Sequence, residues 1–365
     1  MELAVSLMND DMEFGQLGGF TYLDMAALGI APASVRERVQ AQLAEYMLYG
    51  TCARDEYRPD EIIRRANASV RDLLGAPAGY TFVGSTATAV SDAVLQAMPS
   101  GRGSVVCCTD DYPGLVTLAR RYAARTGREL RLVPGEWNAR ALLTFIDEGT
   151  SVVLTSHVHW ITGAVMDLAA LSAARRALGF TFVVDASQAM PIVPAGAEIE
   201  EIDIFVSVAH KWLCGAPGAA IAHLSPRIIA QLNKTLDDDL WPVVPSNQSY
   251  TSMLALAVMS EWFMVYGPER VRERTLAAAS TVRELALQQG WTLVSGSDDF
   301  QQSGIVTLSF PQAQASQFVQ HMRTRGIYLS ARGEGLRLSP HFTLSHEAIG
   351  RAIGTLSTAA RELQF

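Results

Sequence analysis

The chain has 365 residues, enough to bury a large core and to form one large and one smaller domain. Its composition, 49% hydrophobic and 18% charged residues, is that of a globular protein and excludes a disordered chain. The formal net charge of −8 argues against a general nucleic-acid binder, which usually carries a basic face.

The sequence indicates neither a membrane span nor a secretion signal. Its apolar stretches are of strand length, and residues 1–11 carry acidic side chains where a signal peptide has a basic region. The four cysteines, Cys52, Cys107, Cys108 and Cys214, show neither metal-ligand spacing nor a disulfide framework. We therefore expect a cytoplasmic protein without membrane or nucleic-acid contacts and without a metal site.

From residue 36 to residue 223, helix-like and strand-like segments alternate. Helical spacing of apolar residues predicts helices at 36–48, 64–74, 87–97, 115–126, 138–146 and 168–178. Apolar runs predict strands at 81–83, 104–108, 129–132, 151–155, 180–184, 204–208 and 219–223. Because these strands lack polar alternation, the pattern indicates an α/β fold whose parallel sheet is covered by helices on both faces.

The last third of the chain has a different character. It predicts helices at 250–266, 267–290, 313–326 and 345–363 and strands at 304–310, 328–331 and 336–340, after a loop at 241–249. We therefore predict an N-terminal arm at 1–20, a large domain at 21–262 and a smaller α+β domain at 263–365, which the arm accompanies.

Lysine is rare in this chain. Of the 29 basic residues only Lys211 and Lys234 are lysines, and Lys211 follows the predicted strand 204–208. Arginine cannot replace an amine that must lose a proton and form an imine, so a lysine kept in this background points to amine chemistry. Taken alone, a surface lysine on a loop is the more common interpretation.

Asp185 comes directly after the apolar strand 180–184. A carboxylate at the end of a buried strand is costly unless a cation meets it, and a protonated pyridine nitrogen is such a cation. Gln188, three residues later, could hydrogen-bond an oxygen of the same ring. The plain alternatives are an aspartate that caps the following turn and an ordinary turn glutamine.

A phosphate site and a stacking aromatic are also indicated at strand ends. Gly84, Ser85 and Thr86 join a strand to a helix, where main-chain N–H groups and hydroxyls suit a phosphate. Tyr112 follows the strand 104–108 and could stack on a flat heterocycle. Ser and Thr are also ordinary helix caps, and a Tyr in a Pro-Gly turn is usually structural. The agreement of all four signals at strand ends favours one site.

Two motifs carry a family resemblance. They are V-V-D-A-S-Q-A, which contains Asp185, and A-H-K-W-L-C-G, in which Lys211 follows that aspartate by 26 positions. The pair resembles the class V aminotransferases of fold type I, which include cysteine desulfurases and isopenicillin N epimerase-like proteins, and the Trp-Leu after the lysine resembles the epimerase-like branch. Weaker matches extend over roughly residues 20 to 360, at 21–24, 82–86, 156–163 and 336–341.

The resemblance implies a fold type I enzyme that depends on pyridoxal 5′-phosphate (PLP), with a mostly parallel seven-stranded sheet in its large domain. It implies a homodimer with active sites at the subunit interface and a small amino-acid substrate. It assigns Lys211 to the Schiff base and to proton transfer, Asp185 to the pyridine nitrogen, Gln188 to the ring hydroxyl, Gly84, Ser85, Thr86 and His210 to the phosphate region, Tyr112 to stacking on the ring, and Arg337 with Arg332 to the substrate carboxylate.

Several positions depart from the family pattern. Met25 and Trp160 stand where the family often has asparagine near substrate or ring, so we count both as substrate-site residues. Ser207 lies one position further from the lysine than the equivalent serine of desulfurases. Asn247 stands in place of the threonine that reaches the partner subunit's phosphate, and we assign it to cofactor binding.

No cysteine lies in the segment 330–340, where a cysteine desulfurase needs a mobile thiol. A persulfide-forming desulfurase is therefore not expected. We favour a carbon–sulfur lyase, or a related β-eliminating or deaminating enzyme, that acts on a cysteine S-conjugate in secondary metabolism. Amino-acid epimerisation, transamination and a non-catalytic PLP-fold protein remain the alternatives.

Overall fold

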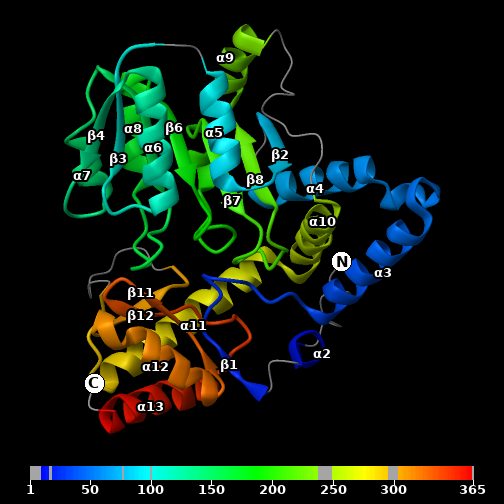
Figure 1. Cartoon of the computed structure of the whole chain (residues 1–365), viewed down its shortest axis with the longest axis vertical. Helices are drawn as coiled ribbons and strands as arrows, with labels where there is room; N and C mark the ends of the chain where they lie inside the picture. The colour runs from blue at the N-terminus through cyan, green and yellow to red at the C-terminus, as the bar shows by residue number, and fades with distance from the viewer. Residues whose placement is uncertain are drawn as a thin grey trace.

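The fold was analysed in a computed structural model, which describes residues 10–15, 19–75, 78–98, 101–236, 249–294 and 303–363. In these residues a seven-stranded sheet with the order β2-β8-β7-β6-β5-β3-β4 forms the centre of the larger unit (Figure 1). Its strands are β2 (Tyr80–Gly84), β3 (Ser104–Cys108), β4 (Glu129–Val133), β5 (Thr150–Ser156), β6 (Thr181–Asp185), β7 (Ile204–Val208) and β8 (Ala220–Leu224).

The sheet is mostly parallel, which confirms the predicted fold class. β4, β3, β5, β6 and β7 pair in parallel, whereas β8 runs antiparallel to both β7 and β2. Neighbouring residues of one strand point into different cores: Val106 and Val153 belong to one apolar cluster, and Val105 and Val152 belong to another. Since both faces are buried, these strands consist of continuous apolar runs.

Helices cover both faces of this sheet. Side chains of α5 (Ala87–Ala97), α6 (Pro113–Thr126) and α9 (Pro226–Leu236) share a core with one face. Side chains of α4 (Pro59–Leu74), α7 (Ala139–Leu143), α8 (Leu168–Leu178) and α10 (Tyr250–Tyr266) share a core with the other. The predicted helices are all present within a few residues, but α9 was not predicted. Outside this sandwich, α3 (Ala33–Tyr49) packs on α10 and connects to α4.

The C-terminal unit has its own core. It contains α11 (Pro268–Gln288), α12 (Gln312–Thr324), α13 (His346–Glu362) and an antiparallel sheet with the order β11-β12-β9, formed by β9 (Val306–Ser309), β11 (Ser330–Arg332) and β12 (Gly335–Leu338). The predicted single strand 328–331 is wrong. It consists of β10 (Ile327–Tyr328) and β11, which separate at Leu329 because they pair with different partners.

The start of the described chain joins this C-terminal unit. β1 (Thr21–Tyr22) pairs in parallel with β10, and Leu23 is buried in the C-terminal core. Figure 1 shows β1 beside the C-terminal elements, below the large sheet. The segment after β1 then reaches the large unit, where the Gly29 N–H donates to the carbonyl of His210. Residues 21–29 therefore link the two units next to Lys211. None of the helices in the described segments combines the length and apolar character of a membrane span.

Candidate active site

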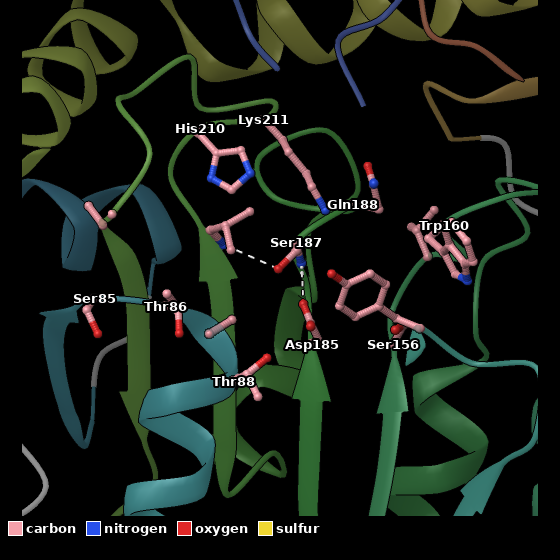
Figure 2. A pocket seen from close by; sticks show the side chains of 16 residues that line it. Ser85, Thr86, Thr88, Ser156, Trp160, Asp185, Ser187, Gln188, His210 and Lys211 are labelled. Atoms are coloured by element: carbon pink, nitrogen blue, oxygen red, sulfur yellow. Dashed lines mark hydrogen bonds between the residues drawn. The ribbon is translucent and has the colours of Figure 1, made fainter. Parts of the chain in front are cut away.

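A cavity of about 330 Å³ lies at the carboxyl ends of the parallel strands (Figure 2). Each of several strands contributes the residues that follow it, as expected for a parallel sheet with helical crossovers. The lining residues are Ser85, Thr86, Ala87 and Thr88 at the start of α5, Tyr112 after β3, Ser156, Val158 and Trp160 at and after β5, Asp185, Ser187 and Gln188 at and after β6, and Val208, His210, Lys211, Gly218 and Ala219 around β7 and β8.

Lys211 extends into this cavity from the turn after β7 (Figure 2). Its Nζ lies 5.7 Å from the ring centre of Tyr112. Burial lowers the pKa of Lys211 to about 8, and Asp185 opposes this shift while Arg337 and Arg332 reinforce it. A primary amine with this pKa is largely neutral slightly above pH 8, so Lys211 is suited to nucleophilic attack on a carbonyl group.

The turn that carries Lys211 is held by close main-chain packing. The Lys211 carbonyl accepts a hydrogen bond from the Cys214 N–H at 2.8 Å, and the His210 carbonyl accepts one from the Gly29 N–H at 2.8 Å. A Cβ atom at Gly29 would lie 2.0 Å from the Lys211 carbonyl oxygen. Only glycine therefore allows this approach, which fixes the backbone from which the lysine extends.

Asp185 is the last residue of β6 and is 8% exposed. Its Oδ1 accepts a hydrogen bond from the Ser187 N–H at 2.8 Å, and the Ser187 Oγ accepts one from the Val208 N–H at 3.3 Å. Burial raises the pKa of Asp185, and the Ser187 side chain and then the charge of the nearby Lys211 partly offset this shift. Within the described residues no cation lies within 4 Å of this carboxylate, so it can serve a cationic group in the cavity.

The N-terminus of α5 forms another wall. Thr86 is the N-cap, and its Oγ1 accepts a hydrogen bond from the Ala89 N–H at 3.1 Å. Gly84 ends β2 just before it, where a Cβ atom would lie 2.2 Å from Cγ2 of Val90. Ser85 and Thr86 are exposed at this helix end, where free main-chain N–H groups favour an anion such as a phosphate.

Asp111 is a site residue that the sequence analysis missed. It is 3% exposed, and its carboxylate accepts hydrogen bonds from the Tyr112 N–H at 2.7 Å, the Ser156 Oγ at 2.5 Å and the Trp137 Nε1 at 2.9 Å. It therefore orients Tyr112 and Ser156, which both line the cavity. The signal was present, because Asp111 follows a buried strand in the same way as Asp185.

Two aromatic rings bound the cavity beyond the strands β3 and β5. The rings of Tyr112 and Trp160 meet edge to face, with centres 5.9 Å apart and planes at 80°. Tyr112 is 40% exposed, so one side of its ring remains free for contact with another group. This geometry suits a flat ligand near Tyr112.

Gln188 and His210, which the resemblance assigns to the ring hydroxyl and the phosphate region, also line the cavity. The Gln188 Nε2 donates to the Ala26 carbonyl at 3.0 Å and its Oε1 accepts from the Trp212 Nε1 at 2.9 Å. The amide is thus fixed in orientation, with one N–H left for a ring oxygen. Burial, followed by the charge of Lys211, lowers the pKa of His210, which favours a neutral imidazole.

Other predicted site residues lie outside the lining of this cavity. Met25 is 2% exposed and belongs to the core, and Ser207 is buried, with its Oγ 3.4 Å from the Ala186 carbonyl. Arg337 is buried, and its Nη1 donates to the Trp160 carbonyl at 2.8 Å. Arg332 is partly buried on β11. Asn247 lies outside the described residues.

The described residues contain no group of three or more His, Cys, Asp or Glu side chains that could hold a metal ion.

The model of the family described as Aminotransferase class-V matches residues 21–238. The chain belongs to this family. A kynureninase from Deinococcus radiodurans is 26% identical over 392 residues, which cover 96% of this chain and 93% of that protein. An isopenicillin N epimerase from Streptomyces clavuligerus is 26% identical over 183 residues, which cover 48% of this chain and 46% of the epimerase. The predicted resemblance is therefore confirmed.

Solved structures confirm the predicted fold. The cystine C–S lyase C-DES, in complex with its reaction product cysteine persulfide, superposes with a TM-score of 0.84 at 19% identity, covering 94% of this chain and 99% of that chain. The cysteine desulfurase CsdA from Escherichia coli superposes with a TM-score of 0.82 at 18% identity, covering 98% of this chain and 99% of that one. The fold is that of the fold type I enzymes.

Pyridoxal 5′-phosphate is the cofactor of this family, and the cavity fits it chemically. The ring nitrogen requires an acidic partner, and Asp185 is a buried carboxylate without an ion pair in the described residues. The aldehyde requires an amine, which Lys211 offers with a lowered pKa. The phosphate requires N–H and hydroxyl donors, and the start of α5 presents them through Ser85, Thr86 and Thr88.

Proposed function

We propose that this protein holds pyridoxal 5′-phosphate as a Schiff base on Lys211 and acts at the α-carbon of an amino acid as a carbon–sulfur lyase. The observation that carries the proposal is the meeting of Lys211, Asp185 and the N-terminus of α5 around a single cavity. Bound PLP acts as an electron sink that weakens bonds at the α-carbon of an attached amino acid.

Different residues of the cavity would hold the ring, the phosphate and the transferred proton. Asp185 would hold a proton at the ring nitrogen, because its buried charge is favoured only beside a cation. Gln188 would donate to the ring oxygen, and Tyr112 would cover one face of the ring. Ser85, Thr86, Thr88 and His210 would hold the phosphate. Once the substrate amine has replaced it, the Lys211 amine is free to move a proton at the α-carbon.

Arg337 would bind the substrate carboxylate. Its guanidinium is buried, is tied to Trp160 in the cavity wall and lies close enough to lower the pKa of Lys211. A guanidinium matches a carboxylate with two parallel N–H donors. Arg332 adds positive charge from the neighbouring strand β11.

The cysteines favour elimination over persulfide formation. Cys107, Cys108 and Cys214 are buried, and the exposed Cys52 lies after α3. None of the four lines the cavity. Burial raises the pKa of both Cys108 and Cys214 to about 12, which keeps these thiols protonated and poor nucleophiles. A desulfurase needs a thiolate that reaches the substrate sulfur. A lyase needs only Lys211 as the base and a leaving group on the β-carbon.

The first experiment tests the cofactor. Purified protein supplied with PLP should become yellow, and borohydride reduction followed by peptide mass analysis should place the cofactor on Lys211. Lys211→Ala should lose the covalent link, whereas Lys234→Ala, at the only other lysine of the sequence, should keep it. Wild-type protein that takes up no PLP would contradict the whole proposal.

The second experiment tests the reaction. Cysteine S-conjugates should yield pyruvate, ammonia and a free thiol without any keto-acid acceptor. α-Deuterium exchange without net product would instead indicate epimerisation, and a requirement for a keto acid would indicate transamination. Kynurenine belongs in the same panel, because kynureninases are among the relatives. Persulfide on any cysteine of the protein after turnover would contradict the lyase assignment.

We also propose that the enzyme is a homodimer, as the family resemblance implies, and that it acts in the cytoplasm in secondary metabolism. Sedimentation equilibrium of the PLP-loaded protein measures the oligomeric state, and a monomer at micromolar concentration would contradict a dimer.

A further inference from the structure

Arg337 has an incomplete set of partners behind the cavity wall. Its side chain is 2% exposed. Nη1 donates to the Trp160 carbonyl at 2.8 Å, but Nη2 lies 3.6 Å from Oδ1 of Asp24, beyond ordinary hydrogen-bond distance. Nε has no hydrogen-bond partner in the described residues. One arm of the guanidinium is therefore anchored, and the other donors are available to a second acceptor.

Backbone pairing brings the carboxylate of Asp24 to this place. Ser330 and Arg337 face each other across the antiparallel strands β11 and β12, and Asp24 forms a parallel bridge with Ser339, two residues after the arginine. The Ser330 Oγ donates to Oδ1 of Asp24 at 2.5 Å, the same oxygen that faces Arg337. Ser330 thus holds the carboxylate at a fixed distance from the guanidinium.

The charges around this pair do not balance. Asp24 faces both Arg337 and the nearby Arg332, whose charge acts on both members of the pair. Burial raises the pKa of Asp24 despite the two arginines, and burial lowers the pKa of Arg337 to about 10 despite the aspartate. The one carboxylate therefore compensates two guanidinium groups only in part, and a second carboxylate would be favoured here.

We propose that Asp24 is a positioning residue that acts as a resident counter-ion: it neutralises Arg337 while the site is empty and competes with the substrate carboxylate when substrate binds. The inference rests on the proposed role of Arg337 in carboxylate binding. Without substrate, Asp24 lowers the energetic cost of burying the positive charge of Arg337. When substrate binds, Asp24 repels its carboxylate, so that substrate and product are not held too tightly.

The test is a change of charge at constant shape. Asp24→Asn keeps an oxygen that can accept from Ser330 but removes the negative charge. PLP-loaded wild type and variant are titrated with sodium propionate, a carboxylate without an amine, at constant ionic strength in a calorimeter. Propionate should bind the variant more tightly by on the order of tenfold, since one repulsive charge is gone. The variant without ligand should melt at a lower temperature than the wild type, and propionate should raise its Tm more.

Kinetics supply an independent readout. In Asp24→Asn the KM for the amino-acid substrate should fall by a similar factor, while kcat changes less than twofold. A residue that merely supported the fold would not produce tighter binding together with a lower Tm. Propionate binding that is unchanged or weaker in Asp24→Asn overturns the counter-ion proposal.

Control variants separate the possible failures. Glu347→Gln makes the same change of net charge on the exposed surface of α13 and should leave the propionate Kd unchanged. Arg337→Ala should abolish propionate binding. If it does not, the proposed role of Arg337 is wrong, whereas loss of binding in Arg337→Ala with no gain in Asp24→Asn contradicts the counter-ion proposal alone.

Ser330→Ala extends the test if Asp24→Asn does not fold. Without the Ser330 hydroxyl, Oδ1 of Asp24 loses its competing donor and should pair more closely with Arg337. Propionate should then bind several-fold more weakly than to the wild type, the opposite sign to Asp24→Asn. Unchanged or tighter binding overturns the proposal.

Discussion

Two buried aspartates at opposite ends of neighbouring strands have opposite surroundings. Asp203 lies at the amino end of β7 and is fully buried. Its carboxylate accepts hydrogen bonds from Arg175 at 3.0 Å, from the Arg227 Nε at 2.9 Å, from the Ser225 Oγ at 3.0 Å and from the Phe182 N–H at 2.9 Å. Protein groups satisfy this charge completely, so it joins strands and helices at the end of the sheet away from the cavity.

Asp185, at the carboxyl end of β6, has far fewer partners. In the part of the chain that the structure describes, only Ser187 acts on it at short range, through its main-chain N–H and its side chain, and Lys211 acts on it through its charge. A buried carboxylate with so few hydrogen-bond donors and no ion-pair partner among the described residues destabilises the protein unless an external cation binds. The comparison teaches that the partners of a buried charge, and not burial itself, distinguish a structural aspartate from a functional one.

The largest expected effect is a difference in enzymatic activity between variants of Asp185 and Asp203. Asp185→Asn should lower kcat/KM by on the order of 10²- to 10³-fold, because Asp185 is the proposed charged partner of the cofactor's ring nitrogen. Asp203→Asn should keep the activity of the fraction that is folded. Steady-state kinetics normalised to bound PLP measures both, and a comparable loss in the two variants would break the distinction.

The next effect concerns stability, where Asp203→Asn should have the larger effect and Asp185→Asn the smaller one. In cofactor-free protein, Asp203→Asn should lower the free energy of unfolding by about 3 kcal/mol, because it removes the carboxylate that pairs with Arg227 and one of the two that pair with Arg175. Asp185→Asn should be neutral or slightly stabilising, since it removes a buried charge without breaking an ion pair. Urea unfolding of the two variants measures the difference. Equal destabilisation would show that Asp185 is also a structural residue.

The smallest effect is a shift in pH dependence. PLP uptake by the cofactor-free protein requires the neutral Lys211 amine, so its rate should rise with pH and level off above about pH 8. An ordinary lysine, with a pKa of 10.5, would give a rise that continues to higher pH. Since the charge of Asp185 raises the pKa of Lys211, Asp185→Asn should move the midpoint to lower pH, and Asp203→Asn should leave it in place. Stopped-flow absorbance at a series of pH values tests this order.

The lowered pKa of Lys211 also affects how the stability of the protein depends on pH. Between about pH 8 and pH 10.5 the unfolded state binds the Lys211 proton and the folded state does not, so this group by itself should make the free energy of unfolding rise with pH, against the opposite contribution of Cys108 and Cys214, whose pKa burial raises to about 12. Lys211→Met should remove that rise, as urea titrations of the cofactor-free protein at pH 8 and pH 10 would show.

The sequence predicted that the site lies at the carboxyl ends of the parallel strands, because strand ends can be recognised from local patterns. Apolar runs located β3, β6 and β7 within one residue, and Asp185 and Lys211 follow from them. Carboxyl ends of parallel strands share one edge, so separate signals had to converge. Asp111 was missed although it obeys the same rule, because its partners Trp137 and Ser156 come from distant parts of the sequence.

Contacts between segments that are distant in the sequence could not be predicted from local sequence patterns. The pairing of β1 with β10 joins residues about 300 positions apart, and the approach of Asp24 to Ser330 and Arg337 depends on it. The fixed amide of Gln188 depends on Trp212 and Ala26 in the same way. Nothing in the local sequence of these residues specifies such partners.

The sequence by itself determined the fold class and the family and predicted the amine and acid of the site, because periodicity and short motifs are properties of neighbouring residues. Only the tertiary structure decided which buried charges are satisfied. Asp203 obtains two arginines, Asp185 obtains hydrogen bonding only from Ser187 within the described residues, and Arg337 shares an incomplete pair with Asp24. The physical reason is that the energy of a buried charge depends on groups within a few ångströms, and the packing of distant segments brings those groups together.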